Sequence, residues 1–266
     1  MSGSTGSGDL GVRSLRRRDV DSARRRGSGS SHTVAGRPGG ARLADIERVG
    51  DWIRILRVGR PEGFSFTAGQ YLKVGADGSR TKKFSIASAP GDELLEFCIG
   101  LNPGGTVTPR LFSLEPGWSL ELAPEASGSL ALDESAEVHL MVATTTGIAP
   151  IRSMVRHAME HGSRARFTIL HGASLPADLP YRHEFDQLAS AGTAVSYVPT
   201  VSRPEDVASA GWRGSTGRVE ALALREMEGL DPSRSCVYAC GNDGMVANVR
   251  RAAEDRGLDV RTESFG

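Results

Sequence analysis

Five short stretches of the sequence combine small and hydroxyl-bearing residues, three of them with basic side chains as well, in a way that suits the binding of phosphate groups. Phosphates are held by cations and by backbone N–H groups, which small residues leave accessible. The first stretch, "RTKKFSIASAP" at 80–90, also places the aromatic Phe84 beside Ser85. A planar ring system needs an apolar face and a few well-placed donors, and this run can supply both. The other four stretches are "GGTVTPRL" (104–111), "ATTTGIAP" (143–150), "TVSRP" (200–204) and "YACGNDGM" (238–245).

The stretch at 143–150 is a turn of small residues between an expected strand and an expected helix. Thr146 and Gly147 form the turn, and Pro150 suits the first helical turn. Backbone N–H groups at the start of such a helix can meet a phosphate. The alternative is that the glycine and proline serve the geometry of the turn alone. The Gly-rich run "GGTVTPRL" has the same two interpretations, a phosphate contact through its amides and the Thr108 hydroxyl, or a turn that enters a short helix.

The stretches at 200–204 and 238–245 also follow expected strands. Ser202 and Arg203 stand at a strand end, with Arg218 a short way downstream, and could hold a phosphomonoester. Solvated surface charge is the alternative for both arginines. Cys240 ends the later strand, where a buried cysteine is usually a small apolar filler. After it, Gly241 and Gly244 permit a close approach of a ligand, and Asn242 can cap the next helix.

Alternation of strands and helices predicts the architecture of the second half of the chain, from about 135 onward. Strands are expected at "EVHLMVAT", "ARFTILHGA", "AVSYVPTVS", "SCVYACG" and "DVRTESF", separated by helices at "APIRSMVRHAMEHG", "YRHEFDQLASAG", "GRVEALALREME" and "DGMVANVRRAAEDRG". Right-handed crossovers then give a doubly wound parallel sheet. Such sheets bind ligands at the carboxyl ends of their strands, where the candidate residues lie.

The preceding segment, 41–134, shows short strands and frequent turns. "DWIRILRVG", "QYLKVG" and "ELLEFCIGL" are separated by Gly, Pro and Asp residues, which predicts a small antiparallel β-barrel. We therefore predict three regions: a disordered tail at 1–40, a barrel domain at 41–134 and an α/β domain at 135–266. The tail is rich in Gly, Ser and Arg, and its alternatives are a transit peptide or an RNA or membrane tether.

Composition limits the remaining possibilities. The formal net charge is zero, with 32 basic and 32 acidic residues, so no strong field favours nucleic acid. Three cysteines without Cys-x-x-Cys spacing indicate reduced thiols and predict no metal or iron–sulfur site. No apolar run approaches the roughly 20 residues of a membrane helix. We expect a cytoplasmic, monomeric protein without a membrane or nucleic-acid partner.

The ordered set of stretches resembles the ferredoxin–NADP reductase family over nearly all of 41–266. It comprises "FTAGQYLKV", "KKFSIASAP", "GGTVT", "TTTGIAP", "VSR" and "YACG", in that order. The resemblance implies that Phe84 packs on a flavin ring, that Ser85 lies near the flavin N5 and that Lys82 contacts the flavin phosphate. It further implies catalytic roles for Ser85, Cys240 and Glu263. The predicted cofactor-binding residues are Lys82, Lys83, Phe84, Ser85, Ile86, Ala87, Gly105, Thr106, Val107, Thr108, Thr145, Thr146, Gly147, Ile148, Ala149, Pro150, Ser202, Arg203, Arg218, Cys240, Gly241, Asn242, Met245 and Phe265.

The sequence departs from the family pattern at several positions. Lys82 and Phe84 stand where the family motif has arginine and tyrosine, which removes a bidentate fork and a hydroxyl. Thr144 and Thr145 replace the leading glycines of the nicotinamide turn. Ser174 stands where family members that prefer NADP often have arginine. A turn of the family appears only as "APEASG" at 123–128, so that loop is expected to differ.

The resemblance implies a reductase that binds FAD in the barrel and NADP(H) in the α/β domain, with NAD(H) as a possible nucleotide. Hydride would pass between nicotinamide and flavin, and single electrons between flavin and a ferredoxin or flavodoxin. One alternative is an NADH-dependent reductase component that feeds an oxygenase. Another is a flavin-binding electron-transfer or regulatory subunit with no nucleotide reaction of its own, which the threonines of "TTTG" suggest.

Overall fold

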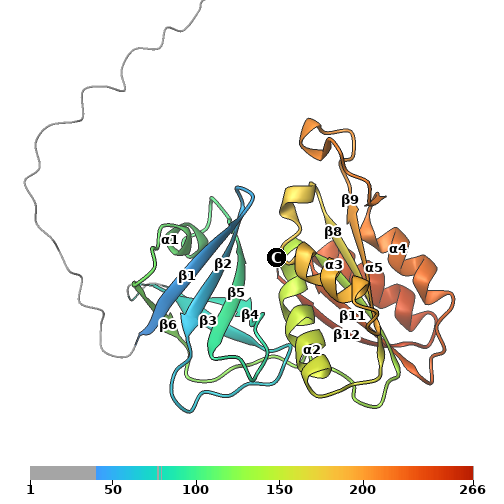
Figure 1. Cartoon of the computed structure of the whole chain (residues 1–266), viewed down its shortest axis with the longest axis horizontal. Coiled ribbons are helices and arrows are strands. Elements are labelled where there is room, and N and C mark those ends of the chain that lie inside the picture. Colours follow the sequence, from blue (N-terminus) through green and yellow to red (C-terminus); the bar gives the residue numbers. More distant parts are fainter. Residues whose placement is uncertain (1–39, 77, 79, 266) are drawn as a thin grey trace, which may run out of the picture. The chain divides into compact units, whose positions relative to one another are not determined.

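Short strands with alternating burial fold the first half of the chain into a six-stranded antiparallel sheet (Figure 1). The structure is a computed structural model that describes residues 40–76, 78 and 80–265. The strand order is β4-β3-β6-β1-β2-β5. The sheet closes toward a barrel where Ile86, just after β4, bridges Phe97 of β5 and the Ala87 N–H donates to the Glu96 carbonyl over 2.7 Å. The strands are β1 (Ala41–Val49), β2 (Ile53–Gly59), β3 (Tyr71–Gly75), β4 (Lys82–Ser85), β5 (Leu94–Gly100) and β6 (Ser119–Leu122).

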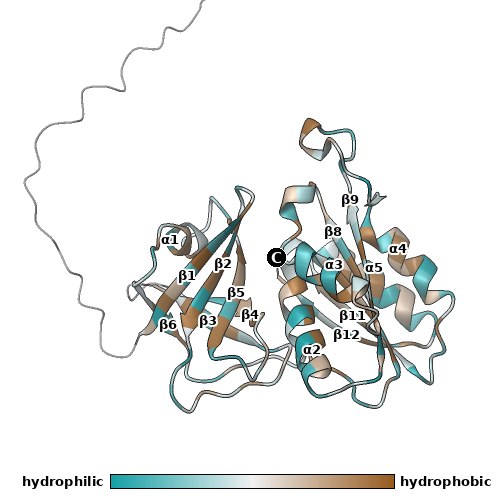
Figure 2. Cartoon of the chain, viewed as in Figure 1, coloured by the Kyte–Doolittle hydropathy of each residue, from teal (hydrophilic) through white to brown (hydrophobic). Residues whose placement is uncertain are grey.

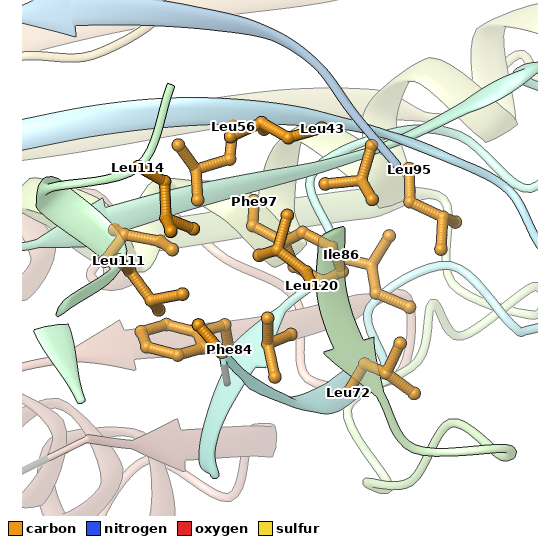
Figure 3. Close-up of a cluster of buried hydrophobic side chains, with 14 of the residues drawn as sticks. Leu43, Leu56, Leu72, Phe84, Ile86, Leu95, Phe97, Leu111, Leu114 and Leu120 are labelled. Atoms are coloured by element: carbon orange, nitrogen blue, oxygen red, sulfur yellow. The ribbon is translucent and has the colours of Figure 1, made fainter. Parts of the chain in front are cut away.

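A hydrophobic cluster fills the interior of this sheet. Figure 2 shows both hydrophobic and hydrophilic stretches along its strands, and β5 alone buries five successive residues. Leucines from β1, β2, β3 and β6 meet Phe97 and the short helix α1 (Thr108–Phe112), which contributes Leu111. In Figure 3 Phe84 points into this cluster, next to Leu111. The predicted antiparallel barrel is confirmed.

The second half forms a parallel sheet of six strands in the order β10-β9-β8-β7-β11-β12. Its central strands are almost continuously buried, as expected for a sheet covered on both faces. Every strand predicted for this half is present, together with the two-residue edge strand β10. The strands are β7 (Val138–Thr144), β8 (Arg166–Ala173), β9 (Val195–Val201), β10 (Ser215–Thr216), β11 (Ser235–Gly241) and β12 (Asp259–Ser264).

Helices cover both faces of the parallel sheet, which confirms the doubly wound prediction (Figure 1). Helices α2 (Ile148–Glu160) and α3 (Arg182–Ser190) bury apolar side chains against one face. On the other face, α4 (Val219–Met227) and α5 (Asp243–Glu254) pack against the opposite sides of the same strands.

Strand order reverses between β7 and β11. The chain runs outward from β7 to β8 and β9, then returns to place β11 on the other side of β7. A crevice opens at such a switch point, outside the carboxyl ends of the two strands. The turns that follow β7 and β11 are the two Gly-containing stretches identified in the sequence.

The tail predicted at 1–40 lies, but for Gly40, outside the described residues. A single compact unit holds both sheets, and the domain boundary near residue 134 stays a prediction. Among the helices of the described residues, none has both the length and the apolar character needed to cross a bilayer.

Candidate functional site

The β-barrel carries a cleft of about 210 Å³ that joins two of the predicted stretches. Lys82 at the start of β4 lines it together with Arg80, and the opposite wall is the turn at 105–108 that leads into α1. The first N–H groups of a helix have no partner within the helix. Cations and backbone donors therefore face one space here, as the prediction of a phosphate contact requires.

The Thr108 hydroxyl forms hydrogen bonds within the turn itself, and its predicted contact with a phosphate stays a prediction. It accepts the Asn102 N–H at 2.9 Å and donates to the Asn102 carbonyl at 3.2 Å. The Gly105 N–H donates to the same carbonyl. These bonds shape the turn that forms one wall of the cleft, and Arg80 and Lys82 bring positive charge to the same cleft.

Alternation along β4 sends its side chains to two different surroundings. Phe84 points into the barrel core and is only 8% exposed. Lys83 and Ser85 point to the other side, where the Lys83 ammonium lies 4.8 Å from the centre of the Tyr71 ring. The packing of Phe84 on a flavin ring stays a prediction.

The structure brings the three predicted catalytic residues together from distant parts of the chain. The Ser85 Oγ lies 3.4 Å from Glu263 Oε2, and Glu263 on β12 pairs in register with Cys240 on β11. Burial raises the pKa of the Glu263 carboxyl to about 7, although Ser85 and Lys83 partly oppose this shift. A carboxyl with this pKa can both give and take a proton near neutral pH. The Cys240 thiol is fully buried and desolvation raises its pKa, so it stays protonated.

Two glycines allow the turns after β7 and β11 to touch. A Cβ at Gly147 would collide with the carbonyl oxygen of Cys240, and one at Gly241, which has φ +138°, would collide with the Thr144 hydroxyl. That hydroxyl accepts the Asn242 N–H at 2.9 Å, and the Asn242 side chain caps α5 as predicted. The turn after β7, where a nucleotide was predicted to bind, therefore packs directly against the turn after β11 at the point where the strand order reverses.

Thr145 in this turn has φ +49°, a left-handed conformation that a β-branched residue adopts only at a cost. Its carbonyl oxygen lies 2.9 Å from His171 Nε2, and His171 Nδ1 lies 3.0 Å from the Tyr197 hydroxyl. Burial lowers the pKa of His171 to about 4, so the imidazole is neutral. No sequence motif pointed to this support, although His171 lies near the end of β8, the strand that Ser174 follows.

A second cleft of about 200 Å³ opens at the carboxyl ends of β7, β8 and β9. Ser202 and Arg218 line it with Ser174, and Arg203 is exposed just beyond the lining residues. Thr145 and Asn242 lie on its other wall. The structure thus brings two of the stretches that were predicted to contact phosphate, 143–150 and 200–204, to one cleft. Glu220 also lines the cleft and was not predicted.

Five of the predicted cofactor-binding residues have side chains in the hydrophobic cores, so their contacts with a cofactor stay predictions. They have 0–1% exposure, namely Ile86, Ala87, Ile148, Ala149 and Met245. The N–H groups of Ile86 and Ala87 are bonded to the carbonyls of Gln70 and Glu96. Thr146 and Pro150 form the turn and the first helical turn as expected. Phe265 is half-buried against the core that includes α2, and its predicted contact with a cofactor also stays a prediction.

Two buried side chains of helix α2 bind the segment that follows Ser85, and neither belongs to a predicted site. Arg152 donates to the Ala87 carbonyl at 2.8 Å and pairs with Glu96 at 3.1 Å and Glu184 at 2.7 Å. The Ser153 hydroxyl donates to the Ser88 carbonyl at 2.6 Å. The helix that starts at the nucleotide turn therefore also holds the strand end that carries Ser85.

One group of side chains in the described residues has a spacing that metal ligation would allow. Ligand atoms of Asp133, Cys236 and Asp259 lie within 4.8 Å of one another. The Arg261 guanidinium contacts both carboxylates, at 3.1 and 3.5 Å, and so offsets part of their negative charge. All three cysteines of the chain are buried and free.

Known proteins resemble this chain both in sequence and in fold. Residues 141–251 match the model of an oxidoreductase NAD-binding domain. Ferredoxin–NADP reductase B of Sorangium cellulosum is 34% identical over 83% of this chain and 93% of that protein. The flavodoxin/ferredoxin–NADP reductase of Escherichia coli is 32% identical over 70% of this chain and 77% of that protein. More distant curated relatives include reductase components of oxygenases.

Solved structures show the same fold. A ferredoxin NADP⁺ reductase from Neisseria gonorrhoeae with bound FAD and NADP superposes with a TM-score of 0.75 at 20% identity, covering 84% of this chain and 97% of that chain. Fold, clefts and sequence thus define a two-module oxidoreductase. The chain belongs to the ferredoxin–NADP reductase family, as the ordered motifs predicted.

Proposed function

We propose that the chain is a reductase that transfers hydride between NADP(H) and bound FAD and exchanges single electrons with a ferredoxin or flavodoxin. The observation that carries the proposal is the convergence of Ser85 from β4 with Cys240 and Glu263 from the parallel sheet. Ser85 belongs to the half predicted to hold flavin, and Cys240 to the half predicted to hold nucleotide. Residues with these two roles must meet if the two rings are to react.

The residues present fit both cofactors. Lys82 and the amides of the turn at 105–108 face the cleft of about 210 Å³ and would hold the flavin phosphates. The second cleft, with Ser202 and Arg218, would hold the adenosine end of the nucleotide, with Arg203 at its rim. When bound, the flavin supplies the hydride and single-electron chemistry. We assign FAD to residues 41–134 and the nucleotide to 135–266.

The protein's own contribution is alignment and proton handling. Gly147 and Gly241 let the turns after β7 and β11 close on each other, which leaves a defined floor beside Cys240. Correct placement of reacting groups can lower a barrier by several kcal/mol. Glu263, with a pKa of about 7, exchanges protons with solvent or with Ser85 at the pH at which the reaction runs. Oxidation of NADPH to NADP⁺ releases one proton for every two electrons, so a group of this kind is needed.

We infer the kind of electron partner from the names of the curated relatives. Those with the higher identities are named as reductases of ferredoxin or flavodoxin. We expect a monomer that works in the cytoplasm with such a carrier and binds neither nucleic acid nor membrane.

A second candidate is an NADH-dependent reductase that feeds an oxygenase. Ser174 favours it, because this residue lines the nucleotide cleft at a position where an arginine would have favoured a 2′-phosphate. Relatives named as reductase components of oxygenases also support it.

Rapid-mixing absorbance measurements on the purified protein test both candidates. A yellow protein that is bleached at lower concentrations of NADPH than of NADH, and that then reduces a ferredoxin or flavodoxin, supports the first proposal. Bleaching by NADH alone supports the second. A protein that remains colourless after addition of FAD would refute both, because neither function is possible without flavin.

A further inference from the structure

The cleft that would hold the adenosine end of the nucleotide has a charge composition that the family motifs do not predict. Among the described residues lining it, Arg218 and Glu220 carry opposite charges and the others are neutral. The Arg218 Nε and Nη2 atoms both donate to Glu220 Oε1, at 3.1 and 2.7 Å. One edge of the guanidinium is therefore already occupied by a carboxylate.

The two members of this pair differ in how firmly they are held. The Glu220 side chain is 12% exposed, whereas that of Arg218 is 71% exposed. Glu220 lies in the first turn of α4, where the unpaired N–H groups and the helix dipole favour a negative charge. The carboxylate is thus a fixed part of the cleft wall, and the guanidinium is its movable partner.

A fixed carboxylate affects the two nicotinamide nucleotides in opposite ways. A ribose 2′-hydroxyl can donate a hydrogen bond to a carboxylate, which is how many nucleotide sites bind NAD. A 2′-phosphate is repelled by it and also competes with it for Arg218. Ser174 and Ser202 can hydrogen-bond either group, so they do not compensate for this difference.

We propose that Glu220 is a specificity-determining residue, which weakens the hold of this cleft on a 2′-phosphate and brings the affinities for NADPH and NADH closer together. The inference rests on the proposed function, since it assigns the cleft to the nucleotide. Arg203, exposed at the end of β9, remains as the cation that sustains binding of NADPH. Glu220 acts both directly on the phosphate and through Arg218.

The test compares Glu220→Gln with the wild-type protein and with Glu226→Gln. Glu226 is exposed on the same helix and is not among the lining residues, so its replacement removes the same charge without touching the cleft. Flavin reduction is followed with NADPH and with NADH. We expect Glu220→Gln to raise the ratio of kcat/KM for NADPH over that for NADH by at least about tenfold, because even with the screening of bulk water the repulsion between a unit charge and a nearby phosphate dianion is worth about that factor. The gain should come mainly from a lower KM for NADPH. Glu226→Gln should leave the ratio within about twofold.

A binding measurement separates this inference from the proposed function. Calorimetric titrations with 2′,5′-ADP and 5′-ADP report on the 2′-phosphate without any redox reaction. If neither nucleotide bleaches the flavin but Glu220→Gln still tightens 2′,5′-ADP about tenfold, the proposed function fails and the role of Glu220 stands. If both nucleotides bleach the flavin and Glu220→Gln changes neither the kinetic ratio nor the affinity for 2′,5′-ADP, the role of Glu220 is refuted.

Combining Glu220→Gln with Arg218→Ala then separates the two ways in which Glu220 weakens binding of the 2′-phosphate, direct repulsion and competition for Arg218. If the gain for 2′,5′-ADP disappears in the double variant, Glu220 acts by occupying Arg218. If part of the gain persists, direct repulsion contributes that part. A gain that is larger without Arg218 would contradict the competition for its guanidinium.

Discussion

Replacing Glu263 by Gln should remove a titration near pH 7 from both the stability and the reaction of the protein. Burial raises the pKa of this carboxyl from 4.5 to about 7. A shift of this size corresponds to about 3 kcal/mol, which partial exposure to solvent reduces to about 2 kcal/mol. Because the pKa is raised in the folded state, the favourable contribution of Glu263 is complete below pH 4.5 and is lost as pH rises through 7. Glutamine mimics the neutral form, so the variant should be more stable than wild type by about 2 kcal/mol at pH 8.5 and similar to it near pH 4.5.

The reaction provides a second measurement of the same group. In the direction that oxidises NADPH a proton must leave the site, so the ionised Glu263 is the working form and carrier reduction should slow as pH falls through about 7. The variant should lack this inflection, while Glu226→Gln, which neutralises an exposed carboxylate on α4, should retain it. Urea unfolding at pH 4.5 and 8.5 and the pH profile of kcat for carrier reduction provide the data. If Glu263→Gln keeps the inflection and gains no stability at pH 8.5, the carboxyl does not titrate near 7 and the reasoning fails.

Three further changes test the supports of the site. Ser85→Ala should slow flavin reduction in single-turnover absorbance measurements with little loss of bound FAD, and an unchanged rate would contradict its place beside the reacting atoms. Arg152→Met should lower the free energy of unfolding by about 3 kcal/mol, because it removes one of the ion-pair partners of the buried Glu96 carboxylate. Arg156→Met on the same helix breaks a more exposed ion pair and should lower the free energy of unfolding by less than about 1 kcal/mol. Equal losses for the two variants in denaturant titrations would refute this distinction. His171→Gln should reduce the loss of stability between pH 6.5 and 4 by roughly 3 kcal/mol. The wild-type imidazole is neutral in the folded protein and takes up a proton on unfolding in this pH range, which favours the unfolded state as pH falls. An unchanged acid profile of stability would exclude this histidine as the source.

The sequence predicted the parallel sheet well because its strands are buried on both faces. A run such as "LMVA" in β7 has little alternation and can lie only in a covered sheet, and the turns after it are marked by Gly and Pro. Strand β1 was harder to recognise because charged residues interrupt "ARLADIERV" and only Leu43 is fully buried. The two-residue strand β10 depends entirely on its pairing with β9, which no local pattern encodes.

The sequence predicts site residues well where a local turn determines their position. It does not predict them where tertiary packing determines the direction or the partner of a side chain. Lys82 and the turn at 105–108 follow from motif and order, and the structure places them around one cleft. The direction of Phe84 depends on which face of β4 is buried, and a four-residue strand does not reveal this. Glu220 resembles an ordinary exposed acid at a helix start until the fold places it against Arg218.

Helix α2 provides the reason why the two halves of the site keep a common geometry. It begins at the turn that touches the carbonyl of Cys240, and one to two turns later Arg152 and Ser153 bind the carbonyls of Ala87 and Ser88. The peptide between Ser85 and Ala87 is short and runs through the fully buried Ile86. A shift of Ser85 relative to Cys240 would therefore break buried hydrogen bonds and a buried ion pair, which costs several kcal/mol. Alignment of the reacting groups is thus built into the fold by contacts that touch neither cofactor.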